Sequence, residues 1–374
     1  MRKSPREHDR HMMAQALMLA ARGLGSTSPN PPVGAVVVRN GRVIGAGYHR
    51  RAGGPHAEVL ALRRAGTRAR GATLYVTLEP CCHLDKRTPP CAPLILKSGI
   101  VRIVVATADP NPKVQGRGIA ALRRAGVKVD VGVGRSEAET LIEPYRTRLR
   151  TGYPFVTLKV AATLDGKIAT ARRKSRWITG LAARRVVRTL RAASDGILVG
   201  IGTVLADDPS LTAGPNSAPS VKPLRIVLDP NLRIPLGSQV LTDGKARSLV
   251  VATAAAPKTQ LEILRRRGVE VLVLPQLNGR VEWKALLTEL GQRGLNALLI
   301  EGGAEVNASA LQSGVVDRLI YFIAPKLLGG HDAIGAIGGL CPPNLTDAVR
   351  LRKVRVSQVG SDIMIEGRVQ QDKG

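Results

Sequence analysis

The sequence is poor in aromatic, cysteine and acidic residues, and it contains no long apolar run. Aromatic residues make up only 2% of its 374 residues against 44% for all hydrophobic residues, so its cores must consist mainly of Leu, Val, Ile and Ala. Four cysteines are too few for a disulfide framework in a chain of this length. No stretch approaches the roughly 18 apolar residues of a membrane span, and the charged N-terminus lacks the apolar segment of a signal peptide. We therefore expect a soluble, cytoplasmic protein that does not associate with a membrane.

Basic residues outnumber acidic residues by 56 to 28, which gives a formal net charge of +28. This charge favours acidic partners, which include phosphorylated metabolites, nucleic acids and anionic membranes. The basic residues are scattered, often in pairs such as Arg50-Arg51 and Arg184-Arg185, without a long basic block or interleaved aromatic residues. This pattern favours a solvated basic surface over a nucleic-acid groove, so a nucleic-acid partner is the less favoured interpretation.

The length of the chain favours two domains, and both halves alternate helical and strand patterns in the manner of layered α/β proteins. Asp9 is predicted to cap the first helix, and Asn40-Gly41 marks a hairpin turn. The segment 143–154 is charged and predicted to be turn-rich, so we place the boundary there, with domains at 1–149 and 150–374. Strands are expected at 33–39, 42–48, 73–78, 102–107, 127–131, 155–161, 196–199, 224–228, 249–252, 269–274, 297–300, 318–323, 354–359 and 362–369, and helices at 57–64, from 91, at 118–125 and at 179–193.

Three residues of the first half form a candidate zinc site. His56-Ala57-Glu58 is followed by Pro80-Cys81 and then by Cys91. One imidazole and two thiolates leave a fourth zinc position open for water, which is typical of catalytic rather than closed structural sites. Glu58 lies two residues from a ligand and is the candidate proton carrier between the water and the leaving amine. The arrangement is similar to the zinc deaminase signature, although the cysteines there are closer together.

Other interpretations of these residues stay open. A His-Ala-Glu triplet at a helix start is often incidental, and Cys81 and Cys91 could form a structural site or remain buried thiols. The catalytic interpretation is favoured because a strand, a Glu-Pro-Cys loop and a helix follow one another in the right order. Cys82 and Cys341 receive no role.

Further motifs make the resemblance specific. They are Asn30-Pro31-Pro32-Val33-Gly34, His49, Glu79-Pro80-Cys81-Cys82-His83, Arg87-Thr88-Pro89-Pro90-Cys91 and Asp109-Pro110-Asn111-Pro112. Together they resemble the bifunctional deaminase–reductase family of riboflavin biosynthesis. The resemblance implies a cytidine-deaminase-like three-layer domain, with Zn²⁺ held by His56, Cys81 and Cys91, and substrate contacts at Asn30, His49, His83, Arg87 and Thr88. The gap between Cys81 and Cys91 is one residue longer than is usual in the family.

The second half carries weaker signals of its own. It has no G-x-G-x-x-G after its first strand and no Walker A motif, which argues against Rossmann and P-loop folds. The strand 297–300 runs into Glu301-Gly302-Gly303 and a predicted helix, where small residues would let a pyrophosphate reach helix amides. A simple tight turn explains the same residues, and Trp177 alone is more often a packing residue than a cofactor contact.

The resemblance extends through this half. The motifs are Leu158 to Ala169, Ser175-Arg176-Trp177-Ile178-Thr179, Gly200-Ile201-Gly202-Thr203, Ala206-Asp207-Asp208-Pro209 and Ala324 to Gly330. The resemblance implies a dihydrofolate-reductase-like fold that uses NADPH. The cofactor contacts it implies are Ala162, Trp177, Thr203, Asp207, Gly303, Ala304, Glu305, Val306, Asn307, Ala308 and Ser309. The substrate contacts it implies are Lys159, Ser175, Arg191, Leu211 and Glu301. A basic residue that often follows Ser-Leu-Thr in the family is replaced by Ala213-Gly214.

Three hypotheses follow. The first is a bifunctional enzyme that deaminates a small phosphorylated pyrimidine, a diaminopyrimidinone ribosyl 5′-phosphate, and then reduces its ribosyl group with NADPH to a ribityl chain. The second is a zinc-dependent nucleic-acid deaminase with a basic binding domain, favoured only by the charge. The third is a zinc-stabilised scaffold without activity. For the first, which we prefer, we also expect a homo-oligomer.

Overall fold

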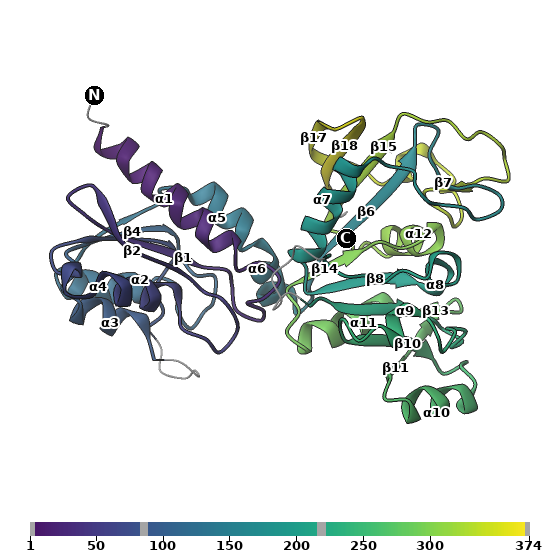
Figure 1. Cartoon of the computed structure of the whole chain (residues 1–374), viewed down its shortest axis with the longest axis horizontal. Coiled ribbons are helices and arrows are strands. Elements are labelled where there is room, and N and C mark those ends of the chain that lie inside the picture. The colour runs from purple at the N-terminus through teal and green to yellow at the C-terminus, as the bar shows by residue number, and fades with distance from the viewer. Residues whose placement is uncertain (1–3, 83–88, 215–221, 371–374) are drawn as a thin grey trace. The chain divides into compact units, whose positions relative to one another are not determined.

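The computed structural model describes residues 4–82, 89–214 and 222–370, and the chain divides into two compact units (Figure 1). The first unit is Met1–Gly152 and the second is Tyr153–Gly374. Each unit has its own sheet and its own buried clusters of aliphatic residues. Aromatic side chains are rare in these clusters, as the composition requires.

The N-terminal unit is a sheet of five strands between two layers of helices (Figure 1). The strands are β1 (Gly34–Arg39), β2 (Arg42–Tyr48), β3 (Thr73–Leu78), β4 (Arg102–Thr107) and β5 (Lys128–Val131), in the order β2-β1-β3-β4-β5. Alternate residues of β1, β3 and β4 face α2 (Ala57–Ala65), α3 (Cys91–Lys97) and α4 (Arg117–Arg124). The intervening residues face α1 (Pro5–Ala21) and α5 (Arg135–Leu141). Because both faces are covered, these strands read as continuous apolar runs.

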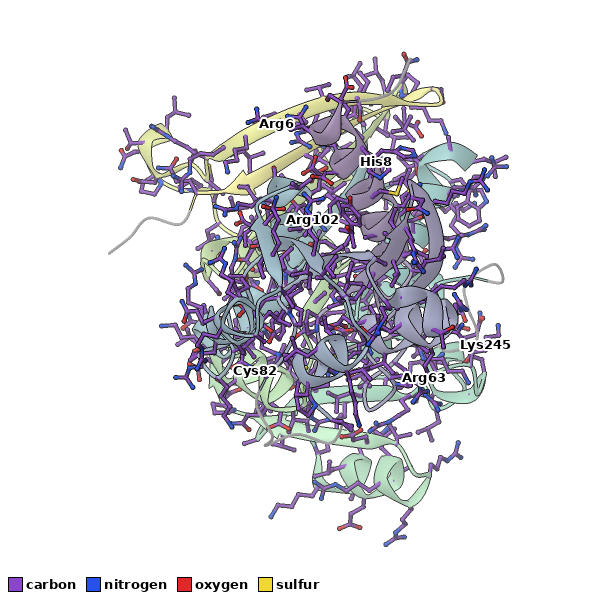
Figure 2. All side chains as sticks on the ribbon, turned by 90° about the vertical axis from the view of Figure 1, so that its left-hand side faces the viewer. Arg6, His8, Arg63, Cys82, Arg102 and Lys245 are labelled. Atoms are coloured by element: carbon purple, nitrogen blue, oxygen red, sulfur yellow. The ribbon has the colours of Figure 1, made fainter. Side chains whose placement is uncertain are left out.

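The first helix begins earlier than the sequence analysis predicted. Ser4 is its N-cap and forms a reciprocal capping box with Glu7, so Asp9 is not the cap. Asp9 instead accepts two hydrogen bonds from Arg102 of β4, at 2.9 and 2.7 Å, and one from the Tyr75 hydroxyl at 2.6 Å. Asp9 thus forms a long-range ion pair in place of a local cap, and this pair joins α1 to the sheet. Arg102 is labelled in Figure 2.

The segment predicted to be turn-rich is largely a helix. It forms α6 (Glu143–Thr151), with Pro144 in its first turn and Gly152 as a left-handed C-cap. Proline fits the first turn of a helix because its missing N–H has no partner there in any case. Tyr145 of α6 is buried, so the helix has an inward face despite its many charged residues.

The C-terminal unit is built on nine strands in the order β11-β10-β9-β8-β14-β6-β15-β18-β17. The strands from β11 to β15 pair in parallel, and β18 pairs antiparallel with both β15 and β17. Their bounds are β6 (Phe155–Thr163), β8 (Gly196–Gly200), β9 (Leu224–Leu228), β10 (Ser248–Thr253), β11 (Glu270–Leu274), β14 (Ala297–Ile300), β15 (Arg318–Ala324), β17 (Leu351–Val359) and β18 (Asp362–Val369). All of these strands overlap the ranges that the sequence predicted.

Helices cover this sheet on both faces. The buried cluster on one face includes residues of α11 (Trp283–Gln292) and α12 (Ala304–Gln312), and the cluster on the other includes residues of α8 (Ile201–Asp207), α9 (Gln239–Thr242) and α10 (Lys258–Arg266). The helix α7 (Leu181–Ala192) packs on β15 through Ala183. Short strands β7 (Lys167–Ala169), β12 (Gln276–Leu277), β13 (Arg280–Val281) and β16 (Ile334–Gly335), with the 3₁₀ turns η1 (Gly66–Ala69) and η2 (Leu345–Asp347), complete the chain.

The described surface is rich in basic side chains. Arg6, Arg63 and Lys245, all labelled in Figure 2, are exposed examples. Among the described helices, none combines the length and the apolar character that crossing a membrane requires.

Candidate active sites

The three residues predicted as metal ligands converge in the N-terminal unit. His56 Nδ1 lies 3.5 Å from Cys81 Sγ and 3.3 Å from Cys91 Sγ, and all three candidate ligand atoms lie within 4.8 Å of one another. His56 directly precedes α2, Cys81 follows β3 and Cys91 is the first residue of α3. One imidazole and two sulfurs at this spacing fit a thiophilic ion such as zinc. Cys82, labelled in Figure 2, is not part of the cluster.

Backbone hydrogen bonds hold the two cysteines together independently of a metal. The amides of Cys91 and Ala92 donate to the Cys81 carbonyl at 3.0 and 3.2 Å, and the Cys91 amide also lies 3.4 Å from Cys81 Sγ. The additional residue in the loop between the cysteines therefore leaves their convergence intact. None of the four cysteines forms a disulfide, and Cys341 is exposed.

A cavity of about 520 Å³ opens beside the cluster. Glu58 lines it and is 3% exposed, and burial raises the pKa of its carboxyl group while the neighbouring His56 opposes that rise. A carboxyl group with a raised pKa is suited to exchanging protons near neutral pH. The first turn of α2 places this side chain two residues after the candidate ligand, as the sequence analysis expected.

Asn30 and His49 line the same cavity and contact each other. The Pro55 carbonyl lies 3.1 Å from His49 Nδ1, and because a carbonyl can only accept, the proton belongs on Nδ1. His49 Nε2 then accepts from the Asn30 amide at 3.1 Å. Burial lowers the pKa of His49, so the ring is a neutral wall of the cavity rather than a cation. His83, Arg87 and Thr88 lie outside the described residues.

Tyr145 is a cavity residue that the sequence analysis missed. Its hydroxyl donates to Asp109 Oδ1 at 3.3 Å, and the Asn111 amide donates to the same oxygen at 2.9 Å. Burial raises the pKa of Asp109 to about 6. No local motif marks Tyr145, because it reaches the cavity from α6, some 35 residues beyond the Asp-Pro-Asn-Pro segment.

Glu79 holds the loop that follows β4 against the loop that carries Cys81. Its two carboxylate oxygens accept hydrogen bonds from four backbone amides, those of Asp109 (3.2 Å), Gly116 (2.9 Å), Gly118 (2.9 Å) and Ile119 (3.1 Å). A Cβ atom on Gly118 would lie only 2.1 Å from the Pro80 carbonyl oxygen, so the close approach of the two loops requires glycine there.

A second cavity, of about 490 Å³, lies in the C-terminal unit. At its base Glu301, with 5% of its side chain exposed, pairs with Lys159 at 3.1 Å and with Arg191 at 2.5 Å. Burial alone would raise the pKa of Glu301, but the two cations prevail and lower it to about 2. These three residues come from β6, α7 and the end of β14, and the structure brings them together as the resemblance implied.

The turn after β14 forms one wall of this cavity. Gly302 and Gly303 precede α12, and Thr203 lies close to Gly303. Asn307 of α12 is 1% exposed; its Nδ2 donates to the Ala336 carbonyl at 2.8 Å, while its buried Oδ1 has no hydrogen-bond partner among the described residues. A buried acceptor without a partner and a helix N-terminus without a side-chain cap fit a ligand that carries both amide donors and phosphates.

Ser175 and Asp207 form another part of the wall. Ser175 Oγ donates to Asp207 Oδ1 at 2.6 Å, and the Arg176 guanidinium donates to the Asp207 carbonyl. Trp177 is 63% exposed and lines the cavity, with the Arg184 guanidinium 4.1 Å from its ring centroid. It is therefore not a core packing residue.

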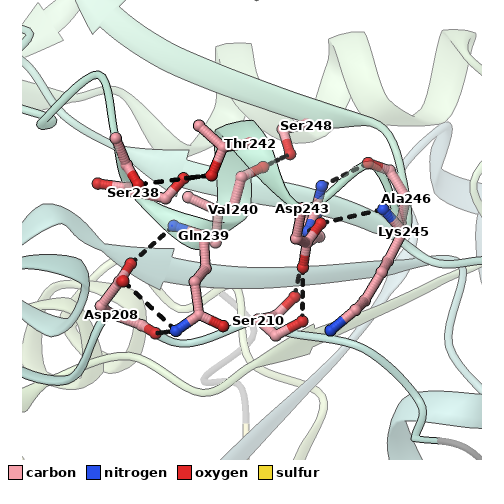
Figure 3. A network of polar contacts seen from close by, with 12 residues as sticks. Asp208, Ser210, Ser238, Gln239, Val240, Thr242, Asp243, Lys245, Ala246 and Ser248 are labelled. Carbon is pink, nitrogen blue, oxygen red and sulfur yellow. Dashed lines mark hydrogen bonds and ion pairs between the residues drawn. The ribbon is translucent and has the colours of Figure 1, made fainter.

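A network of polar contacts fixes the loop 208–211, which carries Leu211 (Figure 3). Asp208 accepts from the Gln239 amide at 2.8 Å, and Ser210 Oγ donates to Asp243 at 2.7 Å. The fully buried Arg225 donates to Asp243 at 2.6 Å and to the Ser210 carbonyl at 3.3 Å.

The predicted contacts of the second half divide into two groups. Those that line the cavity are Lys159, Ser175, Trp177, Arg191, Thr203, Asp207, Leu211, Glu301, Gly303 and Asn307. Those that do not line it are Ala162, Ala304, Glu305, Val306, Ala308 and Ser309. Ala162 is buried in the core, and Ser309 accepts a hydrogen bond from Trp283 at 2.9 Å. The substrate and cofactor roles of both groups stay predictions.

Comparisons with known proteins assign both halves. Residues 6–107 match the cytidine and deoxycytidylate deaminase zinc-binding region, and residues 154–365 match the RibD C-terminal domain. The chain is 45% identical to the riboflavin biosynthesis protein RibD of Aquifex aeolicus, across 96% of this chain and 98% of the relative. The chain belongs to the RibD family. It is also 42% identical to RibD of Escherichia coli, with the same shares of both chains covered.

Solved structures of the RibD family have the same fold. A structure of Acinetobacter baumannii RibD superposes with a TM-score of 0.85 at 39% identity, covering 98% of this chain and all of the other. A Thermotoga maritima diaminohydroxyphosphoribosylaminopyrimidine deaminase/5-amino-6-(5-phosphoribosylamino)uracil reductase gives 0.84 at 35% identity, with the same coverage. As the sequence analysis predicted, the chain is a bifunctional deaminase–reductase of riboflavin biosynthesis, with a zinc-binding deaminase domain and a reductase domain that uses NADPH.

Proposed function

We propose that the N-terminal unit deaminates a diaminopyrimidinone ribosyl 5′-phosphate and that the C-terminal unit reduces the ribosyl group of the product to a ribityl chain. The observation that carries this proposal is a cluster of three candidate ligand atoms, from His56, Cys81 and Cys91, beside a cavity that Glu58 lines. The substrate class comes from the RibD family and from the T. maritima relative named above.

In the deaminase, His56, Cys81 and Cys91 would hold zinc. The ion supplies a Lewis acid that activates water for attack on the ring carbon that carries the amino group. Glu58 takes the proton of that water and delivers it to the ring nitrogen and the departing ammonia. Asn30 and the neutral His49 bind the edge of the pyrimidine through an amide and an imidazole. His83, Arg87 and Thr88 are proposed to complete the substrate contacts.

In the reductase, Ala162, Trp177, Thr203, Asp207 and the residues from Gly303 to Ser309 would hold NADPH. The cofactor supplies a hydride to the ribosyl carbon. Asn307 Oδ1 would accept from an amide donor of the cofactor, since it has no other partner among the described residues. Lys159, Ser175, Arg191, Leu211 and Glu301 would bind the substrate. Because the Lys159–Glu301–Arg191 cluster is already paired, these side chains are held in place before the substrate arrives.

We also propose a homo-oligomer in the cytoplasm, with no nucleic acid as partner. The edge strand β17 exposes Val354 and Val356, at 51% and 66%, among basic side chains, and the unpaired backbone groups of a sheet edge favour pairing with another chain. All four cysteines are free thiols, as is usual in a reducing compartment, which supports the location. A monomer in sedimentation experiments, or a chain recovered outside the cytoplasm, would contradict these assignments.

The direct test of the deaminase assignment is the Glu58→Gln variant. We expect ammonia release from the pyrimidine substrate to fall by at least about a thousandfold, because general acid–base catalysis and water activation are lost together. NADPH oxidation with supplied deaminated substrate should remain at the wild-type rate. Metal analysis should show that the variant retains zinc.

The matched control is Glu137→Gln, which changes an exposed carboxylate of α5 in the same unit. This control should release ammonia at the wild-type rate. Wild-type ammonia release by the Glu58 variant would defeat the catalytic assignment and return the cluster to a structural role.

A further inference from the structure

The helix α7 presents a row of three arginines to the reductase cavity. Arg184, Arg188 and Arg191 are separated by four and three residues, which places them on one face of a helix. All three line the cavity, and Arg185, between the first two in sequence, does not. Only Arg191 was predicted as a substrate contact, so the other two arginines have no assigned role.

The three arginines differ in their partners. Arg191 is engaged by Glu301 at 2.5 Å, and Arg184 lies over the Trp177 ring. Arg188 is exposed and, among the described residues, has neither an acidic partner nor another hydrogen bond. The cavity lining as a whole contains five basic side chains and only two acidic ones. An unpaired guanidinium in a cavity with excess positive charge is a site for an anion.

The position of Arg188 indicates which anion. Its aliphatic stem lies against Gly214, where a Cβ atom would come within 3.2 Å of Arg188 Cδ. Gly214 lies three residues after Leu211, and Arg191 donates to the Thr212 carbonyl between them at 3.2 Å. The network shown in Figure 3 anchors this loop through Ser210. Because the loop carries Leu211 and binds Arg191, Arg188 lies next to two of the proposed substrate contacts.

We propose that Arg188 binds the phosphate monoester of the reductase substrate, as a specificity-determining residue for the phosphorylated form. The inference rests on the proposed function, since that function supplies a phosphorylated ribosyl compound. The guanidinium presents a planar set of donors that matches two phosphate oxygens. Its exposed place at the cavity mouth suits a charged group that remains partly hydrated, while the ribosyl group extends inward toward Lys159, Arg191 and Glu301.

The test compares the intact Arg188→Ala protein with wild type on two substrates, the deaminated pyrimidine with and without its phosphate. We expect kcat/KM for NADPH oxidation to fall about 10- to 100-fold with the phosphorylated substrate, as for loss of charged hydrogen bonds, and to stay the same without the phosphate. The KM for NADPH and the rate of ammonia release should not change. Arg185→Ala, on the same helix but outside the cavity, is the matched control and should resemble wild type.

Three results would overturn the inference. An equal loss with both substrates would show that Arg188 only supports the structure. A change confined to the KM for NADPH would assign it to the cofactor, and wild-type kinetics would remove it from the site. Calorimetric binding of ribose 5-phosphate distinguishes failure of the phosphate-site inference from failure of the proposed function. A wild type that binds ribose 5-phosphate about tenfold more tightly than Arg188→Ala supports the phosphate site even if no pyrimidine is reduced, and equal binding contradicts it.

Discussion

Glu301 lies between two cations with almost no contact with water. Lys159 and Arg191 approach its carboxylate at 3.1 and 2.5 Å, and together they outweigh the cost of burying the charge. Removing one member of such a group lowers the stability by more than the free energy of the lost contacts, because the remaining buried charges lose their partner. The side chain is therefore predicted to contribute to stability as well as to substrate binding.

The stability contribution of Glu301 should depend on pH. Its pKa falls from 4.5 to about 2 on folding, so the charged form stabilises the folded state above the unfolded pKa, and this contribution is lost as the pH falls toward the folded pKa. At neutral pH, Glu301→Gln should lower the free energy of unfolding by about 3 kcal/mol. Urea unfolding monitored at decreasing pH should show the difference from wild type narrowing between these two pKa values. A difference that stays constant over this range would contradict the ion-pair explanation.

At the scale of elements, a single carboxylate joins the metal-ligand loop to the start of α4. Glu79 follows β3 directly. Its carboxylate accepts hydrogen bonds from four backbone amides of the segment that runs from Asp109 into α4. Two residues at the start of this segment, Asp109 and Asn111, line the deaminase cavity. These four hydrogen bonds of Glu79, which we call the Glu79 clamp, thus connect the position of Cys81 to the shape of the substrate cavity.

The Glu79→Gln variant should loosen this connection. A glutamine keeps one acceptor oxygen and turns an NH₂ group toward backbone donors, so about two of the four hydrogen bonds are lost, at a cost of about 2–3 kcal/mol. Hydrogen exchange of the amides of Gly116, Gly118 and Ile119 should accelerate, and zinc should leave the protein faster in the presence of a chelator. Glu137→Gln again provides a control without buried contacts. Unchanged exchange at these amides would show that the clamp is dispensable.

At the scale of the whole molecule, the two chemistries are confined to separate units. All three candidate zinc ligands belong to Met1–Gly152, and every residue that lines the reductase cavity belongs to Tyr153–Gly374. Each unit also has its own sheet and buried clusters. Loss of one active site is therefore not expected to disturb the chemistry of the other.

Removal of zinc tests this independence in the intact chain. Treatment with a strong chelator should abolish ammonia release, because His56, Cys81 and Cys91 are the only group among the described residues that could hold a metal ion. NADPH oxidation with supplied deaminated substrate should continue at the original rate, and added zinc should restore deamination. A parallel decline of both activities on chelation would show that the reductase depends on the folded state of the zinc unit.

The sequence alone was sufficient to predict elements and site residues that depend mainly on local contacts. Runs of apolar and β-branched residues located all the strands of both main sheets, because most of these strands are buried on at least one face. The spacing of His56, Glu58, Cys81 and Cys91 was equally informative, since a metal requires particular donor atoms. Short helices such as α8 and α10 were missed, and α6 was predicted as turns, because their tertiary packing outweighs weak local signals.

The partners of residues that are far apart in the chain follow only from the three-dimensional packing. Asp9 could cap a helix by local rules, yet it pairs with Arg102, 93 residues away. Tyr145 and Arg188 have no motif, and they become candidates only when α6 and α7 turn them toward a cavity. The sequence therefore determines which chemical groups the protein has. Which of these groups come into contact depends on how the sheets and helices pack, because packing involves residues from the whole chain.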